Sequence, residues 1–427
     1  MKASNTRTAR KAALTALDQG ALSAVNFAIG LAFIWKGSPE QYGFFTFYMS
    51  VYYMIAAAQN ALVNAPLMVM SPRMSTPDAR EFERGIEGVL LISMIPVIVL
   101  VPLGVLLPAE YRDGNSWEFM AVAVCCLPLI LRDFFRAEEF ARSEPGTALR
   151  RDLIYASLAL IGVLVIAATG LLSGIMAFLV LSLASLAVVF AVTARIARNV
   201  PSVGAIRSAF TLSWVHSRWS LLGAMSSWMQ ANAFVFIPFF IVSPKQVAIL
   251  AAARMTMTPI QLLVQSWSNV FRPEASKLLA NDDLNGALRL MMQSTIGFSL
   301  ILVVYATVVA LVLSNVPTHW IPPAYRDMGN FIVLWTAVSF VQGLGSNVSS
   351  LLQASLKFRQ LALVGVCVAI TVVVAAIPLT LSLGGTGTLL AVLGGQVLIS
   401  VLMAWLLVKQ VAFLRRTSVT SVAGGVQ

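Results

Sequence analysis

Long apolar runs, separated by short polar segments, recur along the whole chain of 427 residues. Each run can cross the ~30 Å hydrocarbon core of a bilayer as a helix. The pattern predicts twelve spans, at roughly residues 17–35, 42–70, 85–107, 117–135, 153–170, 172–194, 214–241, 246–271, 289–313, 328–352, 361–382 and 387–408. The runs do not alternate residue by residue, as strands of a membrane β-barrel do. They indicate an all-α polytopic membrane protein.

Two short stretches near the outer ends of spans two and eight resemble each other. Ser38 begins SPEQYGFF, and Ser243 begins SPKQVAIL. Aligning the two gives six identities over 34 positions, and each stretch opens the second span of a six-span half. This repeat predicts two six-helix lobes, residues 1–200 and 201–427, related by a pseudo-two-fold axis along the membrane normal.

Composition and charge agree with a membrane protein and orient it. The chain is 58% hydrophobic and 11% charged, whereas a soluble domain carries about 25% charged residues. With both termini on the cytoplasmic side, 24 of the 29 lysines and arginines fall in inward segments and four in outward ones, and Arg254 lies within a span. The positive-inside rule therefore accounts for the net charge of +11, and no nucleic-acid partner is expected.

Arg254 is the clearest polar residue inside a span. It lies ~13 Å into span eight, where an ionisable side chain is costly and usually faces a bundle interior or a wet cavity. Steps of three or four residues place a stripe of polar side chains on the same helical face: Thr258, Gln261, Gln265, Ser268 and Arg272. Pro259 interrupts this helix and predicts a bend. We interpret the stripe as a substrate-binding wall with a hinge at Pro259. The alternative is a structural arginine that holds a kink or a neighbouring carbonyl.

Fainter polar faces occur on other spans. Asn60 and Asn64 are predicted to share a face on span two, and Asn26 lies on a polar face of span one. At the inner end of span four, Arg132 and Arg136 are interpreted as a cytoplasmic gate. Each face alone also fits interhelical hydrogen bonding. Polar faces concentrate on spans 1, 2, 7 and 8, which predicts that the two halves face each other across a hydrophilic cleft. No carboxylate is identified near the middle of a span.

The first two spans carry a further signature, Asp18-Gln19-Gly20 and then Glu40-Gln41-Tyr42-Gly43-Phe44-Phe45. It resembles polysaccharide-biosynthesis membrane proteins, the O-antigen-translocase-like branch of the multidrug/oligosaccharidyl-lipid/polysaccharide (MOP) exporter superfamily. The layout of six plus six spans is similar to that family over the whole chain.

The resemblance implies a MATE-like fold and a flippase of the bacterial inner membrane. Such a protein moves an undecaprenyl-pyrophosphate-linked oligosaccharide repeat unit from the inner to the outer leaflet by alternating access, for exopolysaccharide or O-antigen synthesis. Its partners would be membrane lipid, the lipid-linked oligosaccharide, and the polysaccharide polymerase and glycosyltransferases of the pathway. Arg254 and Arg272 suit the cationic lining of such a cleft, because guanidinium groups pair well with pyrophosphate.

Two other functions stay open. A cation-coupled multidrug antiporter of the same superfamily is expected to carry carboxylates in its cleft. A membrane glycosyltransferase or polymerase needs a sizeable outward loop with catalytic residues, and the largest outward segments, Pro108–Ser116 and Ser314–Asp327, are short. The chain has no phosphate loop, zinc motif or nucleophile elbow. We therefore predict a monomeric transporter that is not an enzyme and has no cofactor, catalytic residue or metal site.

Overall fold

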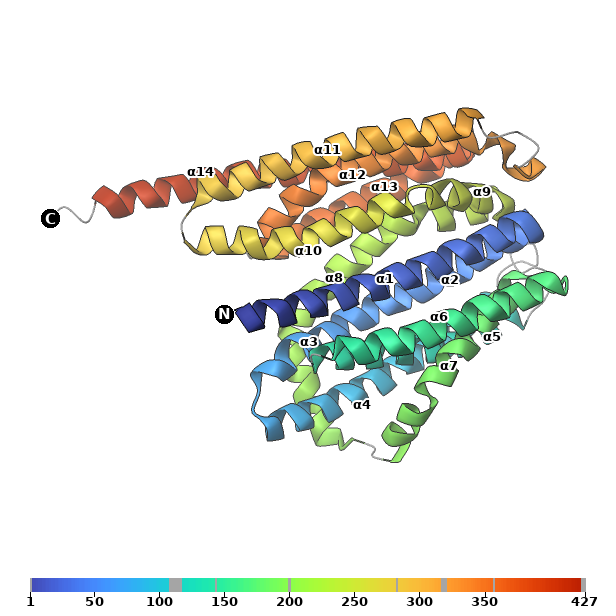
Figure 1. Cartoon of the computed structure of the whole chain (residues 1–427), viewed down its shortest axis with the longest axis horizontal. Helices are drawn as coiled ribbons and strands as arrows, with labels where there is room; N and C mark the ends of the chain where they lie inside the picture. Colours follow the sequence, from blue (N-terminus) through green and yellow to red (C-terminus); the bar gives the residue numbers. More distant parts are fainter. Residues whose placement is uncertain are drawn as a thin grey trace. The chain divides into compact units, whose positions relative to one another are not determined.

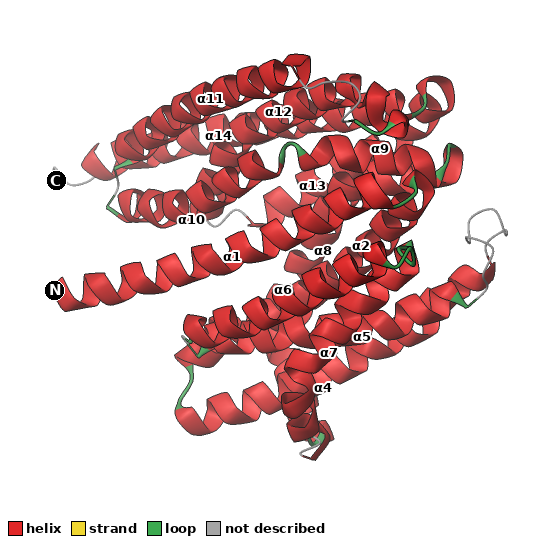
Figure 2. Ribbon diagram, turned by 45° about the vertical axis from the view of Figure 1, so that its right-hand side comes forward, coloured by secondary structure: helices red, strands yellow, loops and turns green. Residues whose placement is uncertain are grey.

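The computed structural model describes residues 2–106, 117–142, 144–198, 201–281, 283–315, 321–355 and 358–423. These residues form helices joined by short turns, and none of them lies in a strand (Figure 2). The α-helices, labelled in Figure 1, are α1 (Lys2–Lys36), α2 (Pro39–Gln59), α3 (Ala65–Met70), α4 (Thr76–Leu100), α5 (Glu118–Ala141), α6 (Pro145–Ala168), α7 (Gly174–Arg198), α8 (Val203–Ile241), α9 (Pro244–Met255), α10 (Thr258–Ala280), α11 (Leu284–Asn315), α12 (Gly329–Ala354), α13 (Phe358–Leu383) and α14 (Gly385–Ala423). Each of the twelve predicted spans coincides with one helix or with consecutive helices.

The chain divides into two compact units. The first unit comprises Met1–Trp228 and Pro238–Ala252, and the second comprises Met229–Ile237 and Ala253–Gln427. This division differs from the predicted boundary after residue 200, because the first half of α8 packs closely on α4. A Cβ atom on Gly85 would lie 2.4 Å from the carbonyl oxygen of Ala205. The glycine thus lets the two helix backbones approach each other.

In the first unit, α1 packs on α6, α5 packs on α7, and α2 contacts both α5 and α7. The two similar stretches found in the sequence are both helix starts. The Ser38 hydroxyl accepts a hydrogen bond from the backbone N–H of Gln41 at 3.2 Å, and the Ser243 hydroxyl accepts one from Gln246 at 3.2 Å. A proline follows each serine, at the position where its missing N–H costs nothing.

The signature around Gly43 joins α2 to its neighbours in the first unit. A Cβ atom on Gly43 would lie 1.9 Å from the carbonyl oxygen of Pro244, at the start of α9. One turn further along α2, the Phe47 ring stacks on the Phe239 ring with centroids 4.1 Å apart. Tyr42 and Phe45 both stack on Phe33 of α1. Helix packing therefore accounts for the glycine and the aromatic residues of this signature.

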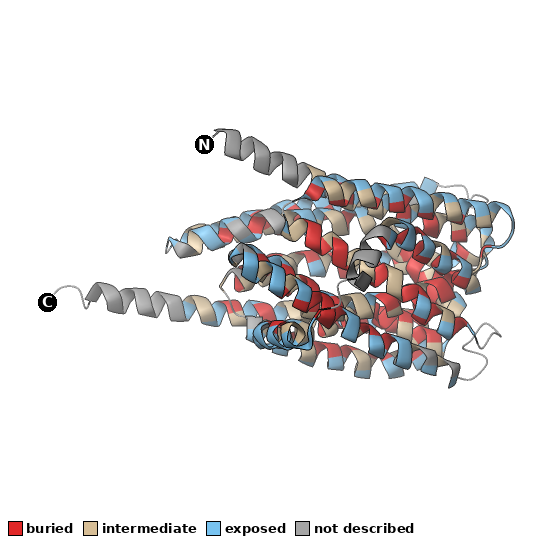
Figure 3. Cartoon of the chain, turned by 90° about the horizontal axis from the view of Figure 1, so that it is seen from below, coloured by how far each residue is buried: buried red, intermediate tan, exposed pale blue. Residues whose placement is uncertain are grey.

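In the second unit, α14 packs on α12 and α13, and α12 also contacts α10 and α11. A buried cluster that includes Phe271, Leu351, Leu352 and Met403 lies where α10, α12 and α14 meet. The outer side of α11 is apolar, and the following side chains on it are at least half exposed: Ile296, Leu300, Val304, Val308 and Leu311. Figure 3 shows exposed and buried residues alternating along individual helices.

Apolar side chains that point out of the protein indicate a lipid environment. Among the described residues, eight helices are long and apolar enough to cross a membrane, or nine if the bent pair α9–α10 counts as one span. Helix α5 is not among them, because it carries Arg132, Asp133 and Arg136. The predicted class, an all-α polytopic membrane protein, is confirmed.

Candidate functional site

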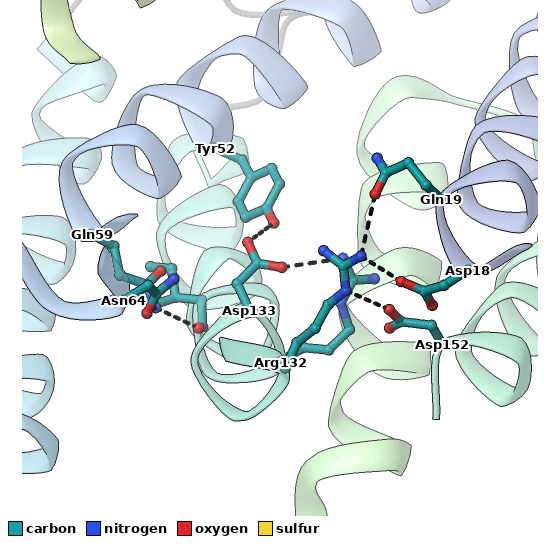
Figure 4. A network of polar contacts seen from close by, with 10 residues as sticks. Asp18, Gln19, Tyr52, Gln59, Asn64, Arg132, Asp133 and Asp152 are labelled. Carbon is teal, nitrogen blue, oxygen red and sulfur yellow. Dashed lines mark hydrogen bonds and ion pairs between the residues drawn. The ribbon is translucent and has the colours of Figure 1, made fainter. Parts of the chain in front are cut away.

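A network of charged side chains lies inside the first unit, where α1, α5 and α6 meet (Figure 4). Arg136 of α5 donates a hydrogen bond to the Asp18 carboxylate of α1 at 2.5 Å and another to the side-chain oxygen of Gln19 at 3.2 Å. Its Nε atom lies 2.8 Å from the carboxylate of Asp152 on α6. The Asp18 side chain is 0% exposed and that of Asp152 is 3% exposed. Arg136 therefore ties three helices together through two buried carboxylates.

Arg132 and Asp133 extend the network toward α2. The Arg132 guanidinium lies 3.3 Å from the Asp133 carboxylate and 3.8 Å from the centroid of the Tyr155 ring. The Tyr52 hydroxyl donates a hydrogen bond to the other Asp133 oxygen at 2.5 Å (Figure 4). Two nitrogens of Arg132, Nε and Nη1, are buried without a hydrogen-bond partner. The guanidinium thus keeps unused donors inside the unit.

The network contains three carboxylates, of Asp18, Asp133 and Asp152, but only two guanidinium groups. One oxygen of Asp18 is buried without a hydrogen-bond partner. Within the described residues, no group of three or more histidine, cysteine or acidic side chains lies close enough to hold a metal ion. The described part of the network therefore holds one more carboxylate than guanidinium groups.

The sequence reasoning identified Arg132 and Arg136 but missed Asp133 and Asp152. Asp133 follows Arg132 directly, and Asp18 belongs to the signature of the first span, so both could have raised the question of buried ion pairs. Nothing in the sequence places Asp152 beside Arg136. The role of the two arginines as a cytoplasmic gate stays a prediction.

The polar residues of span two do not share one exposed face. Residues Asn60–Asn64 form a single π-helical turn, which shifts the helical register by one residue. Asn60 is exposed, whereas Asn64 is buried and accepts a hydrogen bond from Gln59 at 3.5 Å. The two asparagines therefore differ in exposure. Asn26 on α1 is exposed. Substrate binding by these three asparagines stays a prediction.

Arg254 is half-buried at the end of α9 in the second unit. Its Nη1 atom donates a hydrogen bond to the carbonyl oxygen of Ala231 at 3.3 Å. The centre of its guanidinium group lies 4.8 Å from the ring centroid of Phe234 and 5.3 Å from that of Trp335. These are the contacts expected of a structural arginine, and a contact with substrate stays a prediction.

The helix bends by 57° between α9 and α10, and Pro259 lies at the second position of α10. A bend therefore exists where the sequence predicts one, while motion about Pro259 stays a prediction. Along α10, Thr258 and Gln261 are half-buried, and Gln265 and Arg272 are exposed. The Nε atom of Arg272 donates to the carbonyl oxygen of Ser268 at 3.2 Å, which leaves the other guanidinium nitrogens able to bind an anion.

Comparison with known proteins identifies the fold. No profile of a known protein family matches the chain, and no curated protein sequence matches it. Among solved structures, an inward-facing multidrug resistance MATE family transporter of the MOP superfamily is similar, with a TM-score of 0.70, 12% identity, and coverage of 92% of this chain and 95% of that one. An outward-facing transporter of the same description has a TM-score of 0.60, 12% identity and 96% coverage of both chains.

A MOP superfamily transporter from Pyrococcus furiosus is also similar. Its binding pocket has reverse polarity, which suggests a different function for that protein. The TM-score is 0.57, with 13% identity and coverage of 96% of both chains. At these identities the similarity demonstrates the fold alone. The predicted MATE-like fold is confirmed.

Proposed function

We propose that this protein is a flippase that moves an undecaprenyl-pyrophosphate-linked oligosaccharide across the bacterial inner membrane, from the inner to the outer leaflet. Both termini are cytoplasmic, and transport proceeds by alternating access. The observation that carries the proposal is the polar stripe on α10, which follows the bend after α9 and in which Gln265 and Arg272 are exposed.

Amide and guanidinium groups on a membrane helix are costly against hydrocarbon. The exposed amide of Gln265, inside the predicted span, therefore favours an aqueous pathway along α10, and Arg272 lies at the inner end of that pathway. The chemistry of the stripe suits a glycan attached to a phosphate. Amides exchange hydrogen bonds with sugar hydroxyls in both directions, and a guanidinium binds phosphate oxygens through paired N–H groups.

A cation-coupled multidrug antiporter is the second candidate, and one observation favours it. The three carboxylates of the network in the first unit, of Asp18, Asp133 and Asp152, outnumber their two arginines, and two of them, Asp18 and Asp152, are buried. A surplus carboxylate can take up and release a cation, which is the chemistry that coupling to an ion gradient needs. The same network can also couple a flippase to a gradient, so the transported substrate must decide between the two.

The test is reconstitution into liposomes that contain a fluorescent undecaprenyl-pyrophosphate oligosaccharide. Loss of fluorescence to an impermeant quencher measures the lipid that reaches the outer leaflet. We expect protein-dependent translocation that falls about tenfold in Arg272→Gln, because a charge-assisted hydrogen bond contributes about 1.5–3 kcal/mol. Arg289→Gln, which removes an exposed cation from α11, is the matched control and is expected to retain the rate.

A parallel assay measures efflux of a cationic dye against an imposed pH gradient. Dye efflux without glycan translocation would show that the protein acts as the antiporter and not as a flippase. Translocation at the wild-type rate in Arg272→Gln would leave the substrate class intact and remove the α10 stripe from the pathway.

A further inference from the structure

A cavity of about 730 Å³ lies within the first unit. Its wall comes from α2 and the π-helical turn, from α4 and the turn that follows it, from Ile130 of α5, and from α8. Ala58, Leu62, Ile92, Val97, Ile206 and Phe210 are among its lining side chains. The volume is in the range of pockets that hold small ligands, about 300–1,000 Å³. No step of the proposed translocation uses this space.

The wall of the cavity is apolar apart from three side chains. The Ser93 hydroxyl donates to the carbonyl oxygen of Leu90 at 2.7 Å, and the Gln59 amide nitrogen donates to that of Ile130 at 2.9 Å. These two donors are therefore already hydrogen-bonded to backbone carbonyl groups of the protein. An apolar wall of this kind favours a hydrocarbon chain, and it offers few hydrogen-bond partners to a sugar or a nucleotide.

Arg207 is the third polar side chain and the only charged one that lines the cavity. It is exposed, and no ion pair joins it to an acidic side chain within the described residues. It also lines an adjacent open hollow on α8, together with Ser208 and Thr211. Arg207 therefore lies at the edge of an apolar cavity, beside an open hollow on α8. That arrangement matches an amphipathic molecule with a negative charge at the junction.

The position of Arg207 along α8 fits the inner membrane surface. Ala205 and Ala209 pack against Gly85, at the start of the third predicted span. Further along α8, the exposed rings of Phe210 and Trp214 stack with centroids 5.3 Å apart. Exposed aromatic side chains are typical of the boundary between hydrocarbon and water. Anionic lipids of the cytoplasmic leaflet attract basic residues at this depth.

From this placement, we propose that the cavity binds one acyl chain of an anionic glycerophospholipid from the inner leaflet and that Arg207 binds its phosphate. The charge of the headgroup favours this lipid over a polyprenyl pyrophosphate. A phosphodiester carries one negative charge, which one guanidinium neutralises, whereas a pyrophosphate carries more charge than one cation can match. The site is thus a lipid site of the first unit, and the inference does not depend on the proposed function.

The test measures lipid binding to the full chain in a neutral detergent by native mass spectrometry. Phosphatidylglycerol and phosphatidylcholine with the same acyl chains are the probes. We expect phosphatidylglycerol to bind about tenfold more tightly, and Arg207→Gln to remove that preference. Arg218→Gln, which removes another exposed cation of α8 that does not line the cavity, is expected to keep it.

A second pair of variants tests the acyl chain. Ala58→Phe fills the cavity and is expected to weaken the binding of both lipids about tenfold. Ala57→Phe is the control, because it changes the neighbouring residue, which does not line the cavity. Equal affinity of wild type and Arg207→Gln for phosphatidylglycerol would overturn the proposal. Displacement of bound phosphatidylglycerol by an equal concentration of undecaprenyl pyrophosphate would overturn the assigned occupant and make the cavity a substrate site.

Discussion

Gly43→Ala is expected to destabilise the first unit, although alanine is the better helix former. The added Cβ would lie 1.9 Å from the carbonyl oxygen of Pro244, and close carbon–oxygen contacts in proteins are about 3.3 Å. The starts of α2 and α9 would have to separate by roughly 1.4 Å. The stacked Phe47 and Phe239 rings hold the end of α8, just before α9, against α2. Overpacking of this kind costs about 1–3 kcal/mol, and more where backbone must move.

The assay is thermal unfolding of the purified protein in detergent, followed by size-exclusion chromatography of the heated samples. Gly20→Ala is the matched control, because it lies in the same sequence signature and an added Cβ meets nothing within 4 Å. The control is expected to be neutral or to stabilise the protein by about 0.5–1 kcal/mol. If Gly43→Ala unfolds at or above the wild-type temperature, the close approach of α2 and α9 is wrong.

Two further predictions concern the arginines. Arg136→Gln leaves two buried carboxylates without their cation and is expected to lower the free energy of unfolding by about 3–5 kcal/mol, measured by thermal unfolding. Adding Asp18→Asn to the same chain should recover part of this loss. Simple additivity of the two changes would argue against a direct pair. Arg254→Ala removes the contacts with Ala231, Phe234 and Trp335 and is expected to cost about 1–2 kcal/mol, with Arg254→Lys in between. The liposome assay separates the two roles of Arg254, because it measures translocation per folded molecule. If Arg254 contacts substrate, this rate falls in the variants. If Arg254 is purely structural, the rate stays at the wild-type value.

The length and spacing of apolar runs were enough to predict the helices. A bilayer requires about 20 apolar residues for each span and requires the backbone to satisfy its own hydrogen bonds, so composition and run length carry the information locally. Helix starts at Ser38 and Ser243 are local in the same sense, because the cap and its partner are three residues apart. The bend near Pro259 also follows from one residue that cannot continue the hydrogen-bond ladder.

Tertiary structure decided which polar groups meet. Arg136 and Asp18 are separated by 118 residues, and their contact depends on how α1 and α5 are rotated when they pack. Gly43 is required because the start of α9 passes next to it. The first half of α8 belongs to the first unit for the same reason, since small residues let it approach α4. Hydrophobic periodicity indicates that a face is buried, but the partner that buries it is determined only when distant helices pack together.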